Sequence, residues 1–324
     1  MKAILIGNRE RFEKFYPDTD FANSVEKIYL TMEQAACGIP RDASDAEFLA
    51  ADAIAQVPEG MMKQLPALKI IHSEGVAYNG IDCAAAAKRG IYVCNNRGVN
   101  ADAVAEQTIL LMLGLLRDVT AGDAAVRAGQ QIQLKESMMV NGITELGECR
   151  IGLIGFGDIA KAVAERLAPF GCEIFYQASH RKDSETEKRY GVSWMERDEM
   201  LRTCDIISIH VPVTPDTIHL VNEEFLKKMR PTALLINTAR GEIVDNAALK
   251  KALTEGWIAG AGLDTVAPEP VPASHPLLDI AGILFSPHIG GVTTGVFRKG
   301  HRNIWAAFEQ VSKGERPANI VNGL

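Results

Sequence analysis

Three side chains in the last third of the sequence have complementary chemistry: Arg240, Glu269 and His288. A guanidinium group can bind a carboxylate through two parallel hydrogen bonds, and an imidazole transfers protons near neutral pH. A carboxylate beside the imidazole favours its protonated form. Each residue alone also fits an ordinary structural role, as a turn arginine, a solvated glutamate or a hydrogen-bonded histidine. Together they suit the reduction of a 2-oxo acid, in which a carboxylate is bound and a carbonyl oxygen is protonated.

Each of the three residues comes after an apolar run that we interpret as a β-strand. The runs are 233–237 before Arg240, 259–263 before Glu269 and 283–286 before His288. In open α/β sheets, ligands bind at the carboxyl ends of the strands. We therefore expect the three side chains to gather around one site.

A glycine-rich loop lies upstream, where residues 151–160 contain the pattern G-x-G-x-x-A with Gly155, Gly157 and Ala160. A strand is predicted before it, and a helix and a second strand after it. Gly155 would permit the tight turn, Gly157 would let a pyrophosphate approach the helix N-terminus, and Ala160 would allow close helix–strand packing. A glycine-rich turn without a ligand is the alternative, but the flanking elements favour dinucleotide binding.

The second strand of this unit ends without the carboxylate that usually binds the ribose hydroxyls of NAD. Gln177 and Ala178 occupy that place, no acid appears before Asp183, and Ser179, His180, Arg181 and Lys182 follow. A hydroxyl and two cations suit a 2′-phosphate, although a solvated basic loop is an alternative. The pattern favours NADP(H) over NAD(H).

The whole chain alternates strands and helices, which predicts an α/β fold with parallel sheets. Its 324 residues favour two domains. Expected strands of the first domain are 2–6, 27–30, 51–55, 68–72 and 91–94, with helices at 60–64 and 83–88. Those of the second are 151–154, 173–176, 206–210, 233–237, 259–263 and 283–286.

Three further segments complete the prediction. Asn100 or Asp102 could begin a long helix that is apolar around most of its circumference and therefore buried on several sides. Residues 129–147 show little periodicity and are interpreted as an extended excursion that could contact a second subunit. Residues 292–314 are predicted to be helical and to pack back on the first domain.

Composition limits the possible partners and location. The net charge of −7 argues against nucleic acid or an anionic membrane as a partner. The six cysteines include no C-x-x-C pair, so no metal site is expected, and free buried thiols are favoured over disulfides. No apolar run approaches the roughly 20 residues needed to span a membrane. We expect a cytoplasmic protein.

Several blocks in a fixed order resemble the D-isomer-specific 2-hydroxyacid dehydrogenase family. Besides the glycine-rich loop they begin at Gly75 (GVAYNGID), Asp102 (DAVAE), His210 (HVPVTPDT), Asn237 (NTARG), Leu263 (LDTVAPEP) and Ser286 (SPHIGG). The resemblance covers nearly the whole chain. It implies two Rossmann-like domains with parallel sheets. A discontinuous, flavodoxin-like substrate-binding domain would comprise 1–100 and 292–324, and an NAD(P)-binding domain 101–291, usually in a homodimer.

The resemblance also implies residue roles. Arg240 matches the substrate-binding arginine, His288 the acid/base and Glu269 its carboxylate partner. The amides of Val76 and Ala77 match groups that hold the substrate carboxylate. Cofactor contacts are expected at Gly155, Gly157, Asp158, Ile159, Gln177, Ser179, His180, Arg181, Val211, Pro212, Thr217, Thr238, Ala239, Asp264 and Gly290.

The sequence departs from the family pattern in places. Ala77 stands where the family commonly has glycine, and Asn79 where it commonly has aspartate. The missing acid after the second strand is similar to NADP-using members such as glyoxylate/hydroxypyruvate reductases. A 3-phosphoglycerate dehydrogenase is an alternative, but no obvious arginine cluster is present for its phosphate. A nucleotide-sensing corepressor is another, although no long disordered extension supports it.

Overall fold

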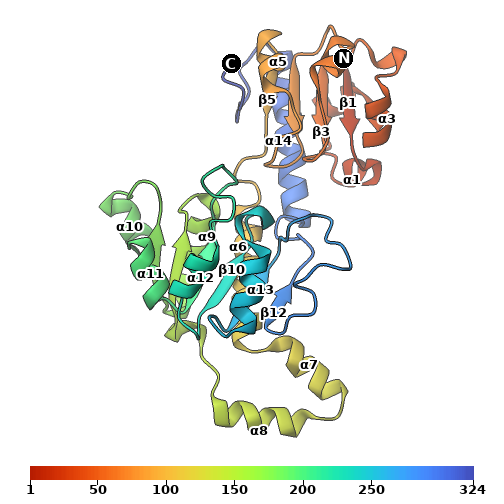
Figure 1. Cartoon of the computed structure of the whole chain (residues 1–324). Coiled ribbons are helices and arrows are strands. Elements are labelled where there is room, and N and C mark those ends of the chain that lie inside the picture. The colour runs from red at the N-terminus through yellow and green to blue at the C-terminus, as the bar shows by residue number, and fades with distance from the viewer. The chain divides into compact units, whose positions relative to one another are not determined.

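The computed structural model describes residues 1–324 and divides into two compact units. Unit 1 comprises residues 1–100 and 293–324, and unit 2 comprises residues 101–292. Each unit is built on one parallel sheet, so the predicted α/β class with two parallel sheets is confirmed (Figure 1).

Unit 1 contains a five-stranded sheet of order β2-β1-β3-β4-β5, the order of the flavodoxin-like folds. Its strands are β1 (Lys2–Ile6), β2 (Glu26–Leu30), β3 (Phe48–Ala51), β4 (Ile70–Ser73) and β5 (Tyr92–Cys94). Its helices are α1 (Arg9–Lys14), α2 (Asp20–Ser24), α3 (Met32–Cys37), α4 (Glu59–Lys63), α5 (Cys83–Lys88) and α14 (Thr294–Ser312).

The central strands β1 and β3 of unit 1 are apolar apart from Lys2 and are buried on both faces of the sheet. Ile4 and Ile6 of β1 pack into a cluster with Leu65. Ala3 and Leu5 point the other way, into a cluster with Phe308. This alternation is the period of two that a strand imposes. The C-terminal helix α14 therefore supplies part of the core under β1 and β3.

Unit 2 contains a seven-stranded parallel sheet of order β12-β11-β10-β9-β6-β7-β8, which extends the six-strand dinucleotide-binding order by one strand. Its strands are β6 (Arg150–Ile154), β7 (Glu173–Gln177), β8 (Val192–Trp194), β9 (Ile206–Ile209), β10 (Leu234–Asn237), β11 (Gly260–Leu263) and β12 (Ile283–Phe285). The strand order reverses between β6 and β9, and both strands lead into loops of the candidate site.

The helices of unit 2 cover both faces of its sheet. They are α6 (Ala101–Leu116), α9 (Asp158–Leu167), α10 (Ser184–Tyr190), α11 (Arg197–Thr203), α12 (Glu223–Lys228) and α13 (Asn246–Thr254). Two further helices of unit 2, α7 (Val119–Arg127) and α8 (Gln131–Asn141), do not cover the sheet and contain no buried residue. The long helix predicted from Asn100 or Asp102 is α6, which begins at Ala101 and packs on α9, β10 and β11.

The structure corrects three sequence predictions. Residues 129–147 are not extended, because they contain the helix α8. Its Gln, Leu, Lys, Glu and Met residues favour a helix although no residue of α8 is buried. The third strand occupies Phe48–Ala51, so its predicted range of 51–55 was placed too late. The short edge strand β8 was not predicted at all.

The structure also tests the predictions of free, buried thiols and of no membrane-spanning segment. All six cysteines are free, but only Cys94, Cys149 and Cys204 are buried, and Cys37 is exposed. The expectation of buried thiols is therefore right for half of them. None of the helices combines the length and apolarity that crossing a membrane requires.

Candidate active site

The candidate acid/base pair of unit 2 is formed by His288 and Glu269. The Nδ1 atom of His288 lies 2.7 Å from Oε1 and 2.8 Å from Oε2 of Glu269. An ionised carboxylate only accepts hydrogen bonds, so Nδ1 carries a proton and donates it. The other ring nitrogen, Nε2, is left to exchange a proton with a ligand.

His288 has a left-handed backbone conformation, with φ of 55°, which is uncommon for a residue other than glycine. The buried carboxylate of Asp264 holds the surrounding loop, residues 286–290, which we call the histidine loop. Its Oδ1 accepts from Ser286 Oγ at 2.5 Å and from the Ile289 amide at 3.0 Å. Its Oδ2 accepts from the Gly290 amide at 2.9 Å. These bonds flank His288 on both sides and fix its backbone.

Arg240 lies just after β10, in an exposed turn. Its Nη1 donates to the Ala239 carbonyl at 2.7 Å, and the guanidinium forms no ion pair with the chain. The next residue must be small, because a Cβ on Gly241 would lie 2.3 Å from the Ala267 nitrogen. This close approach ties the arginine turn to the segment that leads to Glu269. A guanidinium without an acidic partner is suited to bind an anionic ligand.

The phosphate loop, residues 155–157, joins β6 to α9. Gly155 has φ of 95°, and a Cβ there would lie 2.4 Å from the His210 carbonyl oxygen. A Cβ on Gly157 would meet no other atom within 4 Å, so this face of the loop is open. No side chain caps α9, and the N-terminus of this helix points at the loop, where it is suited to bind an anion. The loop therefore fits a dinucleotide pyrophosphate.

Gln177 ends β7, and its carbonyl accepts the Gly155 amide at 2.7 Å, which places it beside the phosphate loop. The residues that follow are partly engaged. Arg181 donates to both oxygens of Glu187 at 2.9 and 3.0 Å, while His180 Nδ1 lies 3.2 Å from Ser179 Oγ. Lys182 forms no ion pair, so it is the cation in this segment that is free of an acidic partner.

The side chains of two residues expected to contact a cofactor, Thr217 and Thr238, form hydrogen bonds within the protein instead. Thr217 Oγ1 donates to the Pro212 carbonyl at 2.7 Å and accepts the Thr214 amide at 2.7 Å. Thr238 Oγ1 lies 2.9 Å from Thr108 Oγ1 in the interior. These contacts leave mainly backbone groups for a ligand, including those of Val211 and Ala239.

Burial lowers the pKa of His210, the first residue after β9, to about 4. Its Nε2 lies 2.9 Å from Ser208 Oγ. The ring is therefore neutral near pH 7 and adds no positive charge beside the phosphate loop, against which its carbonyl packs.

The predicted substrate loop, residues 75–77, belongs to unit 1 and follows β4. Ser73 Oγ donates to the Ala77 carbonyl at 2.5 Å, and Asn95 Nδ2 donates to the Val76 carbonyl at 2.7 Å. The amides of Val76 and Ala77 donate to no acceptor in the chain. Two free neighbouring N–H groups are suited to hold a carboxylate.

Sequence reasoning gave no role to Ser73, Asn95 or Gln107, which support these loops. Gln107 Nε2 donates to Ser286 Oγ at 2.9 Å and so secures the histidine loop from α6. Ser73 is the last residue of β4 and Asn95 directly follows β5, and both are buried. A polar residue at the carboxyl end of a strand is the only signal in the sequence that could have indicated them.

The chain matches known proteins along most of its length. The sequence model of the D-isomer specific 2-hydroxyacid dehydrogenase NAD binding domain matches residues 109–290. A glyoxylate reductase of Thermofilum pendens is 43% identical over 267 residues, which are 81% of this chain and 77% of that protein. A glyoxylate reductase of Thermococcus litoralis is 40% identical over 271 residues, or 82% and 81% of the two chains.

Two solved structures are similar over nearly the whole chain. The NAD complex of a D-isomer specific 2-hydroxyacid dehydrogenase from Lactobacillus delbrueckii has a TM-score of 0.86 and 27% identity, and covers 99% of this chain and 100% of that one. An NADPH-dependent glyoxylate/hydroxypyruvate reductase from Sinorhizobium meliloti, in complex with NADP and malonate, has a TM-score of 0.79 and 28% identity, with coverage of 99% and 96%.

Proposed function

The chain belongs to the D-isomer-specific 2-hydroxyacid dehydrogenase family, and we propose that it reduces glyoxylate or a closely related small 2-oxo acid with NADPH. Membership makes it an NAD(P)-dependent oxidoreductase that interconverts 2-oxo acids and D-2-hydroxy acids. The similarity to glyoxylate reductases favours this activity over the 3-phosphoglycerate dehydrogenase and corepressor alternatives.

The observation that carries the proposal is the His288–Glu269 pair. Because Glu269 accepts from Nδ1, the protonated ring presents Nε2–H to the ligand side. In reduction, this group donates a proton to the carbonyl oxygen of the substrate while Glu269 stabilises the imidazolium. In oxidation, the neutral ring accepts the proton from the hydroxyl group.

The substrate carboxylate would be held by Arg240 and by the free amides of Val76 and Ala77. Arg240 would also stabilise negative charge that develops on the carbonyl oxygen. In this proposal unit 1 is the substrate-binding domain and unit 2 the dinucleotide-binding domain.

The first turn of α9 and the phosphate loop would hold the cofactor pyrophosphate. Hydride transfer at C2 is the chemistry that the bound nicotinamide supplies. NADP(H) is favoured over NAD(H) because β7 ends in Gln177 rather than in an acid, and because Ser179, His180 and Lys182 follow it. Arg181 would join them if it exchanged Glu187 for a 2′-phosphate.

Steady-state kinetics with glyoxylate, hydroxypyruvate and larger 2-oxo acids, each with NADPH and NADH, test the proposal. We expect turnover of the small acids with a higher kcat/KM for NADPH. His288→Ala should lower kcat by roughly 10²–10⁴-fold, the usual contribution of a general acid, and should leave NADPH binding unchanged. Full activity of H288A would contradict the assignment of the acid/base.

The cofactor preference has a separate test. Lys182→Ala and Arg181→Ala should weaken NADPH binding and leave NADH binding unchanged, because only NADPH carries the 2′-phosphate. Equal losses for both cofactors would instead indicate a structural role for this loop.

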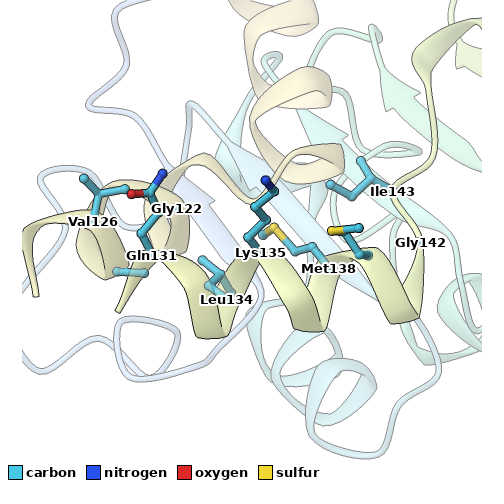
Figure 2. Close-up of a pocket in the computed structure, with 10 residues that line it drawn as sticks. Gly122, Val126, Gln131, Leu134, Lys135, Met138, Gly142 and Ile143 are labelled. Atoms are coloured by element: carbon cyan, nitrogen blue, oxygen red, sulfur yellow. The ribbon is translucent and has the colours of Figure 1, made fainter. Parts of the chain in front are cut away.

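We also propose that the chain forms a homodimer through the helices α7 and α8, which Figure 1 shows as an arm extending from the sheet of unit 2. Neither helix contains a buried residue. Val126, Ile132, Met139 and Val140 are 58–86% exposed. A pocket of about 440 Å³ separates the helices, and Figure 2 shows Leu134, Met138 and Ile143 lining it. An apolar surface of this kind marks an interface.

Light scattering of the purified protein tests this second proposal. The wild type should have the mass of two chains, and Met139→Glu with Val140→Glu should yield a folded monomer. The matched control is Gln133→Glu, also on α8, which adds charge without removing apolar surface. A monomeric wild type would exclude the arm as an interface.

A further inference from the structure

A buried group of ionic side chains lies directly behind the substrate loop in unit 1. Its centre is Glu74, which joins β4 to the loop and whose side chain is 4% exposed. Glu74 Oε1 accepts from Arg11 Nε at 2.8 Å and from His301 Nε2 at 2.8 Å. Arg11 Nη2 bonds to Glu74 Oε2 and, at 2.5 Å, to Asp52 Oδ2. We call Arg11, Asp52, Glu74 and His301 the Glu74 cluster.

The cluster joins parts of unit 1 that are distant in sequence. Arg11 is on α1, Asp52 follows β3 and His301 is on α14. The His301 side chain is 1% exposed, and its ring centroid lies 5.2 Å from that of Phe12 and 6.0 Å from that of Phe15. Burying charges is unfavourable unless each finds its partners, and apolar residues would fill the same space at lower cost. The cluster therefore calls for an explanation other than stability.

The backbone of Glu74 is held as firmly as its side chain. Its amide donates to the Ala51 carbonyl at 2.7 Å, and its carbonyl accepts from Asn96 Nδ2 at 2.8 Å. The helix α14 approaches this point closely, because a Cβ on Gly300 would lie 3.0 Å from Asn96 Nδ2. The Gly75 carbonyl accepts the Asn96 amide at 2.9 Å. The first residues of the substrate loop are thus fixed from several sides.

The free amides of Val76 and Ala77 are the next groups along the chain. Their directions depend on the backbone of Glu74 and Gly75, since the loop has only a few dihedral angles between them. A carboxylate bound by two N–H groups is sensitive to small errors in those directions. Glu74 itself points away from the loop, into the cluster, so its effect on a ligand is indirect.

We propose that Glu74, through its bonds to Arg11 and His301, is a positioning residue that aligns the Val76 and Ala77 amides for the substrate carboxylate. The substrate part of this inference rests on the proposed function. The alignment of the loop by the cluster does not, because it is a property of unit 1 alone.

Glu74→Gln is the main test, since it preserves size and removes the charge. Amide hydrogen exchange at Glu74 and Asn96, whose N–H groups are bonded to Ala51 and Gly75, should accelerate at least about tenfold as the loop loosens. KM for glyoxylate should rise about tenfold with kcat changed much less, because the lost alignment weakens ground state and transition state equally. NADPH affinity should stay unchanged.

His301→Phe is a second variant, which keeps a ring between Phe12 and Phe15 and removes only the donor to Glu74. It should produce the same pattern to a smaller extent. Glu74→Asp, which retains the charge, should partly restore the wild-type exchange rates and KM. These variants keep the test decisive if Glu74→Gln folds poorly.

Asp205→Asn is the control for lost stability. It removes the charge that pairs with Arg230 and one of the two oxygens that accept from Arg230 and from the Arg150 amide in unit 2. It should therefore lower the unfolding midpoint without changing exchange at the loop or KM. Wild-type exchange rates and KM in both Glu74→Gln and His301→Phe would overturn the inference. A wild type that reduces no 2-oxo acid would contradict the proposed function, and the exchange rates would still decide whether the cluster aligns the loop.

Discussion

The phosphate loop of unit 2 and the substrate loop of unit 1 both follow parallel strands, but they are stabilised in different ways. The phosphate loop depends on its own backbone: Gly155 adopts φ of 95°, and Gly157 leaves one face open. The substrate loop depends on side chains from elsewhere, with Ser73 and Asn95 bonding its carbonyls and the Glu74 cluster behind it.

The difference shows what kind of change each loop tolerates. A loop set by backbone geometry should respond mainly to an added Cβ, because no partner residue can compensate for a clash with the main chain. A loop set by remote side chains should respond in graded steps, as single hydrogen bonds are removed. The following predictions test this contrast, from the largest expected effect to the smallest.

Gly155→Ala should have the largest effect. It forces a Cβ to within 2.4 Å of the His210 carbonyl oxygen at a left-handed φ, so we expect at least a ~100-fold loss of NADPH affinity together with a lower unfolding midpoint. Fluorescence titration and thermal unfolding measure the two quantities. Gly157→Ala is the matched control: it should preserve the unfolding midpoint, because its Cβ meets no protein atom, and still weaken NADPH binding. Equal stability losses in the two variants would remove the contrast.

Acid should destabilise both units through one desolvated histidine in each: His72, which is buried, and His210, which is partly buried. Burial lowers the pKa of His72 in unit 1 and of His210 in unit 2 to about 4, from 6.5. The unfolded chain binds these protons first, so stability is complete above pH 6.5 and is lost as the pH falls towards 4. The loss should reach about 3 kcal/mol for each histidine.

Denaturant unfolding at several pH values between 7.5 and 4 measures this loss. His72→Gln and His210→Gln should each reduce the pH dependence, while His180→Gln, at an exposed position, should not. An unchanged pH dependence in His72→Gln would show that this ring is not the group that titrates.

Asp264→Asn should have an intermediate effect on the histidine loop. Asparagine has one accepting oxygen in place of two, so at least one of the donors from Ser286, Ile289 and Gly290 loses its partner. A buried donor left unpaired costs about 1–3 kcal/mol, and His288 would lose its fixed backbone. We expect a lower unfolding free energy and at least a tenfold lower kcat for glyoxylate reduction. Normal kcat would show that Asp264 does not hold His288 in place.

Ser73→Ala should have the smallest effect. It removes the hydrogen bond to the Ala77 carbonyl and the longer one, of 3.3 Å, from the Gly75 amide. Such bonds are worth about 1 kcal/mol each, so KM for glyoxylate should rise several-fold with little change in kcat. Steady-state kinetics measure both constants. A ~100-fold rise in KM, as large as the loss of NADPH affinity expected for Gly155→Ala, would show that the two loops are equally sensitive to a single substitution.

Features that depend on neighbouring residues could be predicted from the sequence, whereas features that depend on distant side chains could not. The parallel α/β fold and the Gly155–Gly157 loop were predictable, because short apolar runs that alternate with helical stretches and a glycine pattern are local signals. Glu269 and His288 are 19 residues apart and form the expected close pair. Their pairing could be inferred because both follow strands of one sheet.

The Glu74 cluster could not be predicted in this way. Arg11 and His301 are separated from Glu74 by 63 and 227 positions, and only the folded chain brings them together. The helix α8 was missed for the opposite reason: its sequence has helix-forming residues, but an unburied helix shows no amphipathic period to detect. The roles of Thr217 and Thr238 in shaping their own loops were likewise invisible to a motif.

The discontinuity of unit 1 has a consequence for the order in which the protein folds during synthesis. Unit 2 is one continuous segment and can complete its core as soon as residue 292 has left the ribosome. The first hundred residues emerge earlier but lack α14, whose Phe308 stacks on Phe48 at 5.1 Å and whose His301 completes the Glu74 cluster. Residues 1–100 must therefore wait, with part of their sheet uncovered, until residues 293–324 have been synthesised. During this interval the exposed apolar surface can aggregate or bind chaperones.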